Sequence, residues 1–93
     1  TKVLDIKNKL EEYNIKVDVI DPFVNKELVL KNYGFSVSND IKSKKKYKLV
    51  ILAVAHSDFV SLSINHWKEF GLPGCLYFDI KGIIPRSLNP IRI

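Results

Sequence analysis

LVILAVA at residues 49–55 is the longest apolar run in the chain. The run has the length of a strand, and it lacks the alternation of polar and apolar residues that marks a half-exposed strand. Continuous apolar strands are typical of parallel sheets that helices cover on both faces. We therefore predict that residues 49–55 form a central parallel strand.

An amphipathic helix is predicted at the start of the chain. Val3, Ile6, Leu10 and Tyr13 recur at spacings of three and four, with charged residues between them. This spacing places the apolar residues on one helical face. The helix is expected to end near Asn14.

A strand and a second helix are predicted to follow. Residues 16–20 are rich in β-branched side chains, and Asp21-Pro22 ends the strand because proline lacks the backbone donor. Asn25 is expected to cap a helix that ends at Gly34. A short edge strand is expected at residues 35–37.

The part of the chain beyond the apolar run contains a third predicted helix and a further strand. Ser63 is expected to cap the helix, and residues 75–78 are expected to form the strand, which ends at Asp79. Residues 86–93 contain a proline and are interpreted as an extended C-terminal tail. The domain itself is then residues 1–85.

This order of elements predicts an α/β fold. We expect a Rossmann-like, doubly wound, mainly parallel sheet of about four strands with helices on both faces. Ligands of such sheets bind outside the carboxyl ends of the strands. The segments expected to converge there are Asp21-Pro22, His56-Ser57-Asp58 and residues 79–82.

Composition excludes several classes of protein. A chain of 93 residues with 46% apolar residues has the size of one globular domain, and its single cysteine excludes a disulfide scaffold and a cysteine-ligated zinc site. No apolar run approaches the roughly 20 residues that span a bilayer. The chain begins at Thr1 and contains no methionine. We therefore expect a cytosolic piece of a longer protein.

The net charge of +5 comes mainly from one short segment. Two interpretations are open: a solvated loop, or a patch that binds a polyanion. The segment lacks the interleaving of aromatic residues with glycines that is typical of base-stacking surfaces, which favours the loop. Its lysines are Lys42, Lys44, Lys45, Lys46 and Lys48.

Three polar residues have both a structural and a functional interpretation. Asp21 could accept hydrogen bonds from a ribose, but no glycine-rich turn precedes it, so a turn-capping role is favoured. His56 could touch a ligand or fix its own loop. His66 could have a functional role, but its interpretation as a surface residue of the third helix is favoured.

Cys75 and Lys81 differ in the chemistry that their surroundings favour. Cys75 is expected to pack as a small apolar side chain, because no cation or helix N-terminus adjoins it. Lys81 follows a strand and could meet a phosphate or sugar oxygen, or be an ordinary surface lysine. No catalytic residue or metal site is predicted. The residues alone indicate a nucleotide-binding type of α/β domain.

Three segments, in order, carry a resemblance to a known family: VDVIDPFV at residues 17–24, LVILAVAHSDF at residues 49–59 and LYFDIKGIIP at residues 76–85. The chain resembles the C-terminal, UDP-binding domain of the UDP-glucose/GDP-mannose dehydrogenase family. It is most similar to the UDP-N-acetylhexosamine 6-dehydrogenases of capsule and O-antigen synthesis.

The resemblance implies a role within a longer cytoplasmic enzyme. Such enzymes oxidise the C6 alcohol of a UDP-linked sugar to a carboxylate with NAD. In the family, the NAD-binding domain, the catalytic cysteine and the central helix that joins two subunits precede this domain. The chain alone is therefore expected to be inactive and without a cofactor. Its expected partner is the nucleotide sugar, not a nucleic acid or a membrane.

The resemblance also assigns site residues. Lys81 takes the place of the family's UDP-contacting arginine, although a lysine lacks the two-pronged guanidinium. Asp79 is expected to orient the loop, and His56 and Ser57 to line the same edge.

One strand of the family's sheet precedes the chain's first helix, so a gap is expected at the centre of the sheet. The strands beside the gap are expected to pair directly, or to borrow a strand from a second copy.

Two other functions remain open. The chain could be a non-catalytic α/β interaction or regulatory module, which would be indifferent to nucleotides. It could also be a basic nucleic-acid-binding domain, whose affinity would fall steeply with salt.

Overall fold

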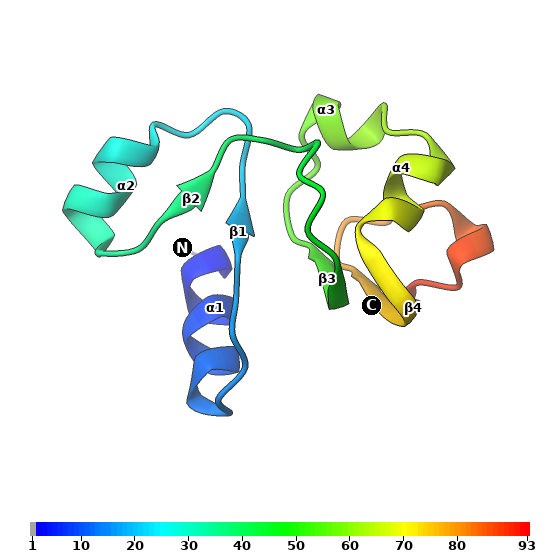
Figure 1. Cartoon of the computed structure of the whole chain (residues 1–93), viewed down its shortest axis with the longest axis horizontal. Helices are drawn as coiled ribbons and strands as arrows, with labels where there is room; N and C mark the ends of the chain where they lie inside the picture. Colours follow the sequence, from blue (N-terminus) through cyan, green and yellow to red (C-terminus); the bar gives the residue numbers. More distant parts are fainter. Residues whose placement is uncertain (1) are drawn as a thin grey trace. The chain divides into compact units, whose positions relative to one another are not determined.

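The chain divides into two compact units, residues 1–43 and residues 44–93. The computed structural model describes residues 2–93 (Figure 1). All strands of residues 2–93 pair in parallel, and a helical segment connects each strand to its partner in the same sheet, so the predicted α/β fold is confirmed.

The first unit contains two helices and two short strands. They are α1 (Lys2–Glu12), β1 (Val19–Ile20), α2 (Lys26–Tyr33) and β2 (Val37–Ser38). The strands β1 and β2 form a two-stranded parallel sheet. The predicted first helix is confirmed, whereas the strand expected at residues 16–20 is reduced to its last two residues.

Local hydrogen bonds set the limits of α2. The Asn25 side chain accepts a hydrogen bond from the Leu28 amide at 3.1 Å, which satisfies one of the free donors of the first turn. Gly34 ends the helix in the left-handed region at φ 74°, where a residue without Cβ is favoured. Both predicted caps are confirmed.

The second unit contains the larger sheet. Its elements are β3 (Tyr47–Leu52), α3 (Ser57–Val60), α4 (Ile64–Glu69), β4 (Gly71–Asp79), a 3-10 helix η1 (Arg86–Leu88) and β5 (Ile91–Arg92). The strands follow the order β3-β4-β5. The segment expected as a C-terminal tail therefore contributes η1 and a strand of this sheet.

The apolar run at residues 49–55 does not form a central strand, which corrects the prediction. The strand ends at Leu52, and β3 lies at the edge of its sheet. Leu49 remains 37% exposed, because the helices cover only part of the apolar surface of the strand. β1 and β3 belong to separate sheets, one in each unit, and direct pairing of the strands beside the expected gap stays a prediction. Borrowing a strand from a second copy stays a prediction.

The core of the second unit lies between α4 and one face of the sheet. Its buried side chains are Leu52, Trp67, Phe70, Tyr77 and Ile84. The Tyr77 hydroxyl donates to the Trp67 carbonyl at 2.8 Å, so the buried phenol is satisfied by the helix that covers it. This bond fixes α4 on β4.

β4 begins four residues earlier than predicted. Tyr47 pairs with Gly71, whereas Leu49 already pairs with Leu76, so the extra residues of β4 form a bulge. A bulge tolerates Pro73 inside a strand. A Cβ on Gly71 would lie 2.6 Å from the Cβ of Cys75, so the bulge also requires a glycine.

Candidate functional site

The second unit brings two of the predicted segments to one edge of its sheet. Leu52 and Asp79 are register partners at the carboxyl ends of β3 and β4. The Ile80 amide donates to the Leu52 carbonyl at 3.0 Å, which extends the pairing by one residue. The loops that contain His56 and Lys81 therefore leave the sheet side by side.

The Asp79 carboxylate organises the loop that follows β4. Its side chain is fully buried. One carboxylate oxygen accepts from the Gly82 amide and the other from the Ile84 amide, both at 2.8 Å. These bonds replace the ladder partners that the backbone loses when the strand ends. Asp79 is thus enclosed by its own loop and shapes it.

Lys81 lies within the loop that Asp79 holds, and it is exposed to solvent. The next residue, Gly82, has a φ of 77°, in the left-handed region that glycine adopts without strain. The turn therefore depends on Gly82 and on the carboxylate that receives its amide. An ammonium group is presented at the carboxyl edge of the sheet.

Arg92 in β5 is a residue of this loop system that the sequence analysis missed. Its Nη2 donates to the Ile84 carbonyl at 2.6 Å, and its Nε lies 3.3 Å from an oxygen of Asp79. Arg92 and Asp79 are register partners in neighbouring strands. The alternation of apolar and charged residues in Ile91-Arg92-Ile93 is the signal that could have predicted a strand here.

His56 and Ser57 lie where the chain enters α3. The His56 carbonyl accepts from the Phe59 and Val60 amides at 3.0 and 3.1 Å, and its ring lies 5.7 Å from the ring of Phe59. His56 thus helps to shape its own loop while remaining partly exposed. Ser57 is the exposed first residue of α3.

Asp21 directly follows β1 in the other unit. One of its oxygens accepts from the Phe23 amide at 2.9 Å and from the Val24 amide at 3.2 Å. The Asn39 side chain donates to the carbonyls of Asp21 and Val24, which closes the same turn. The predicted turn-capping role of Asp21 is confirmed.

Cys75 packs against the core, as predicted. Burial raises the pKa of its thiol above the usual value of 9.0, which keeps the side chain protonated at neutral pH. Its thiol lies 3.4 Å from the Leu76 carbonyl. A protonated, partly buried thiol is a poor nucleophile.

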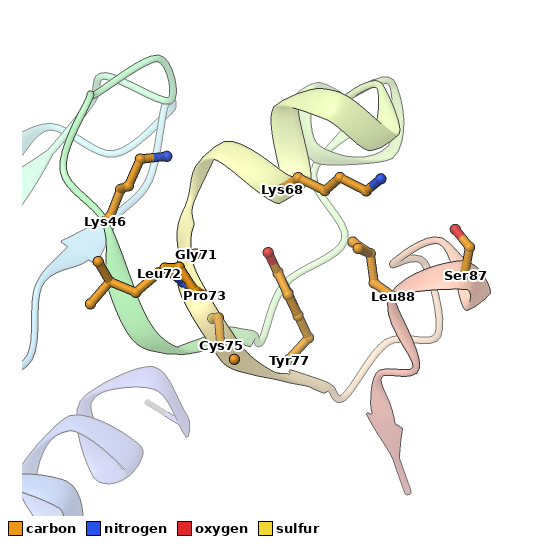
Figure 2. A pocket seen from close by; sticks show the side chains of 10 residues that line it. Lys46, Lys68, Gly71, Leu72, Pro73, Cys75, Tyr77, Ser87 and Leu88 are labelled. Atoms are coloured by element: carbon orange, nitrogen blue, oxygen red, sulfur yellow. The ribbon is translucent and has the colours of Figure 1, made fainter.

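A shallow pocket lies beside the first half of β4, at the other end of the strand from Asp79. Figure 2 shows side chains from β4, α4 and η1 around it. None of the predicted site residues lines this pocket. Its residues include Lys46, Lys68, Cys75, Tyr77, Ser87 and Leu88.

The lysine-rich segment is solvated along its length. All five of its lysines are exposed. The Lys46 ammonium donates to the Glu69 carbonyl at 2.9 Å, close to the end of α4. Such a contact complements the partial negative charge at a helix C-terminus.

Within residues 2–93, no group of histidine, cysteine or acidic side chains is arranged to hold a metal ion. The helices of the same residues are too short and too polar to cross a membrane.

Comparison with known proteins identifies relatives over the whole chain. The family described as "UDP-glucose/GDP-mannose dehydrogenase family, UDP binding domain" matches residues 1–86. The chain is 36% identical, over all 93 residues, to the UDP-N-acetyl-D-glucosamine 6-dehydrogenase of Pseudomonas aeruginosa. It is 30% identical over the same length to the enzyme of that name from Salmonella typhi. In both cases the alignment covers 22% of the relative.

A third relative is Protein CapL of Staphylococcus aureus, which is 37% identical over 87 residues, or 90% of this chain and 19% of CapL. The chain thus spans about a fifth of the length of these relatives. No solved structure matches the chain significantly.

Proposed function

The chain belongs to the UDP-glucose/GDP-mannose dehydrogenase family, as its UDP-binding domain, and on this basis we propose that it binds the nucleotide sugar in a longer UDP-N-acetylhexosamine 6-dehydrogenase. The longer enzyme is proposed to be cytoplasmic and homodimeric and to act in polysaccharide synthesis. Its reaction is the oxidation of the sugar C6 alcohol to a carboxylate. The names of two relatives, both UDP-N-acetyl-D-glucosamine 6-dehydrogenases, support this substrate class.

The observation that carries the proposal is the loop after β4. Asp79 is buried and accepts hydrogen bonds from the Gly82 and Ile84 amides, and the exposed Lys81 lies between Asp79 and Gly82 in the sequence. A diphosphate at this edge would accept a charge-assisted hydrogen bond from the Lys81 ammonium. Because Gly82 has no side chain, a phosphate can approach the loop beside Lys81 closely, while the Gly82 amide itself donates to Asp79.

His56 and Ser57 are proposed to complete the edge. They begin the loop and helix that follow β3, the strand next to β4. The Ser57 hydroxyl and the His56 imidazole both offer hydrogen-bonding groups that suit a sugar hydroxyl or a phosphate oxygen.

NAD does not fit the residues of this chain. Dinucleotide sites of this fold use a glycine-rich turn between a strand and a helix, whose amides hold the pyrophosphate. Of the four glycines, only Gly82 lies between a strand and the helix that follows it, and it is a single glycine before the short 3-10 helix η1, so the chain has no glycine-rich turn of this kind. We therefore place NAD binding, and the chemical step, in other parts of the longer enzyme.

The proposal is tested by the affinity of the chain for UDP, measured by NMR titration. Lys81→Gln removes the ammonium but keeps a side chain of similar length. A charge-assisted hydrogen bond contributes about 1.5–3 kcal/mol, so the Kd should rise about tenfold to hundredfold. The matched control is Lys68→Gln, an exposed lysine of α4 that lines the pocket of Figure 2.

Equal affinity of the wild type and the Lys81→Gln variant would contradict the proposed role of Lys81. Loss of affinity in the Lys68→Gln variant would move the site to the pocket beside β4.

A further inference from the structure

We propose that Arg92 is a positioning residue for the Lys81 loop: from β5 it holds the loop in the shape that presents Lys81. This inference rests on the proposed function. Arg92 lies outside residues 1–86, the part of the chain that the family comparison matches. Its role therefore follows from the contacts of this structure alone.

The first argument is the way in which the loop is held. Residues 80–84 form neither a helix nor a strand. The loop's amides at Gly82 and Ile84 donate to Asp79, and its carbonyl at Ile84 accepts from Arg92. Two side chains thus supply the hydrogen bonds that regular structure would supply elsewhere.

The second argument is electrostatic. Asp79 is fully buried, and a buried carboxylate is costly unless it is paired and hydrogen-bonded. The Nε of Arg92 is itself buried and lies 3.3 Å from Oδ2 of Asp79, an ion pair without hydrogen-bond geometry. Arg92 therefore offsets the charge of the group that receives the loop's amides.

The third argument is geometric. A guanidinium is planar and presents donors in fixed directions, so one side chain can serve the Asp79 carboxylate and the Ile84 carbonyl together. A lysine carries its donors on one nitrogen at the end of a flexible stem, so it does not hold them in these fixed directions. The arrangement uses a property that is specific to arginine.

The consequence for the site concerns Lys81. A flexible loop would have to be ordered when a phosphate binds, and that ordering would lower the affinity. A loop held on both sides of Lys81 avoids this cost. Arg92 then contributes to affinity without touching the ligand.

The test compares four proteins: the wild type, Arg92→Gln, Arg92→Lys and, as the matched control, Arg86→Gln. Arg86 is an exposed arginine of η1. Two quantities are measured on each protein by NMR: the exchange rates of the Gly82 and Ile84 amides without ligand, and the Kd for UDP.

In Arg92→Gln we expect about tenfold faster exchange at both amides and about tenfold weaker UDP binding, the size of one lost charge-assisted contact. The exchange rates and the Kd of Arg92→Lys should lie between those of this variant and the wild type, because lysine keeps the positive charge but lacks the planar guanidinium donors. The β3 amides should stay protected in the Arg92→Lys variant, which shows that the sheet remains folded. Arg86→Gln should match the wild type.

Unchanged UDP affinity in both Arg92 variants would overturn the inference, even if the loop amides exchange faster. A wild-type chain that does not bind UDP would instead overturn the proposed function. In that case, amide exchange at Gly82 and Ile84 would still show whether Arg92 holds the loop.

Discussion

Asp21 and Asp79 are two aspartates that each end a strand and accept two backbone amides, but they differ in their surroundings. At Asp21, one oxygen accepts both amides, in a turn of the first unit. At Asp79, the two oxygens accept one amide each, and the side chain is fully buried beside Arg92.

This difference shows how a common turn becomes the support of a site. The Asp21 device is local, because its carboxylate and its donors lie within four residues. The arrangement around Asp79 also involves Arg92 of β5, which lies thirteen residues further along the sequence. Only the second device ties a loop to the body of a sheet, and that loop carries Lys81.

Substitution by asparagine should lower the stability of the protein far more at Asp79 than at Asp21. In Asp79→Asn, the new amide group must face a backbone donor or Arg92, and the half-buried arginine loses its counter-ion. Breaking a fully buried pair costs about 3–5 kcal/mol of stability, and the loss here should be smaller because Arg92 is partly exposed. Urea unfolding monitored by the fluorescence of Trp67, the only tryptophan and a buried residue of this unit, measures the loss.

At Asp21, asparagine keeps the single oxygen that accepts both amides, so Asp21→Asn should change stability by less than about 0.5 kcal/mol. An exposed acid of the second unit, Glu69→Gln, serves as the control for charge alone. Equal losses in Asp79→Asn and Asp21→Asn would contradict the distinction between the two devices.

Complete removal of the Asp21 carboxylate should reveal the contribution of its turn to stability. Asp21→Ala leaves the Phe23 and Val24 amides without this oxygen, and the loss of such a cap costs about 0.5–2 kcal/mol. The change is local, so amide exchange at these two residues should accelerate while the β3 and β4 amides keep their protection. Accelerated exchange throughout the second unit would show that the turn is not a local device.

The smallest expected effect is a loss of stability at alkaline pH, confined to the unit that contains Asp79. Burial is the main cause that raises the pKa of both Cys75 and Tyr77. Above their usual values of 9.0 and 10.0, the unfolded chain releases these protons while the folded chain retains them. Stability therefore falls as pH rises through this range.

The urea midpoint at several pH values, again followed by Trp67 fluorescence, measures this slope. The variant Cys75→Ala should show a shallower decline than the wild type, because it removes one of the two groups. Identical slopes would mean that other groups, such as the lysines, cause the decline.

The sequence predicted the parts of the molecule that depend on near neighbours. Asn25, Gly34 and Ser63 act within a few residues of their partners, and all three caps are observed. The turn role of Asp21 has the same origin. Such features need only the local order of residues and the hydrogen-bonding groups of each side chain.

Contacts between distant residues were not predictable from the same patterns. The apolar run at residues 49–55 was expected at the centre of a sheet, but strand neighbours are set by topology, and β3 lies at an edge. The first half of β4 was not predicted, because it contains Pro73 and a regular strand excludes proline. The bulge in β4 accommodates this proline. The pairing of Arg92 with Asp79 depends on the formation of β5, for which the only sequence signal is the short alternation Ile91-Arg92-Ile93.

For the candidate site, the sequence placed Asp79 and Lys81 in one loop, and the structure adds how that loop is held. Asp79 faces its own backbone and Arg92, so its proposed role is to orient Lys81. His56 and Ser57 begin the neighbouring loop. Their contribution to ligand binding remains a prediction.

The most direct test of the account is a nitrogen–proton NMR titration of the wild-type chain with UDP and UDP-N-acetylglucosamine, with NAD and a short oligonucleotide as controls. We predict shifts confined to residues 79–82 and 56–58, caused by the UDP compounds alone. Shifts at the lysines of residues 42–48 with the oligonucleotide, or no response to UDP, would contradict the claim that the loop after β4 binds the nucleotide sugar.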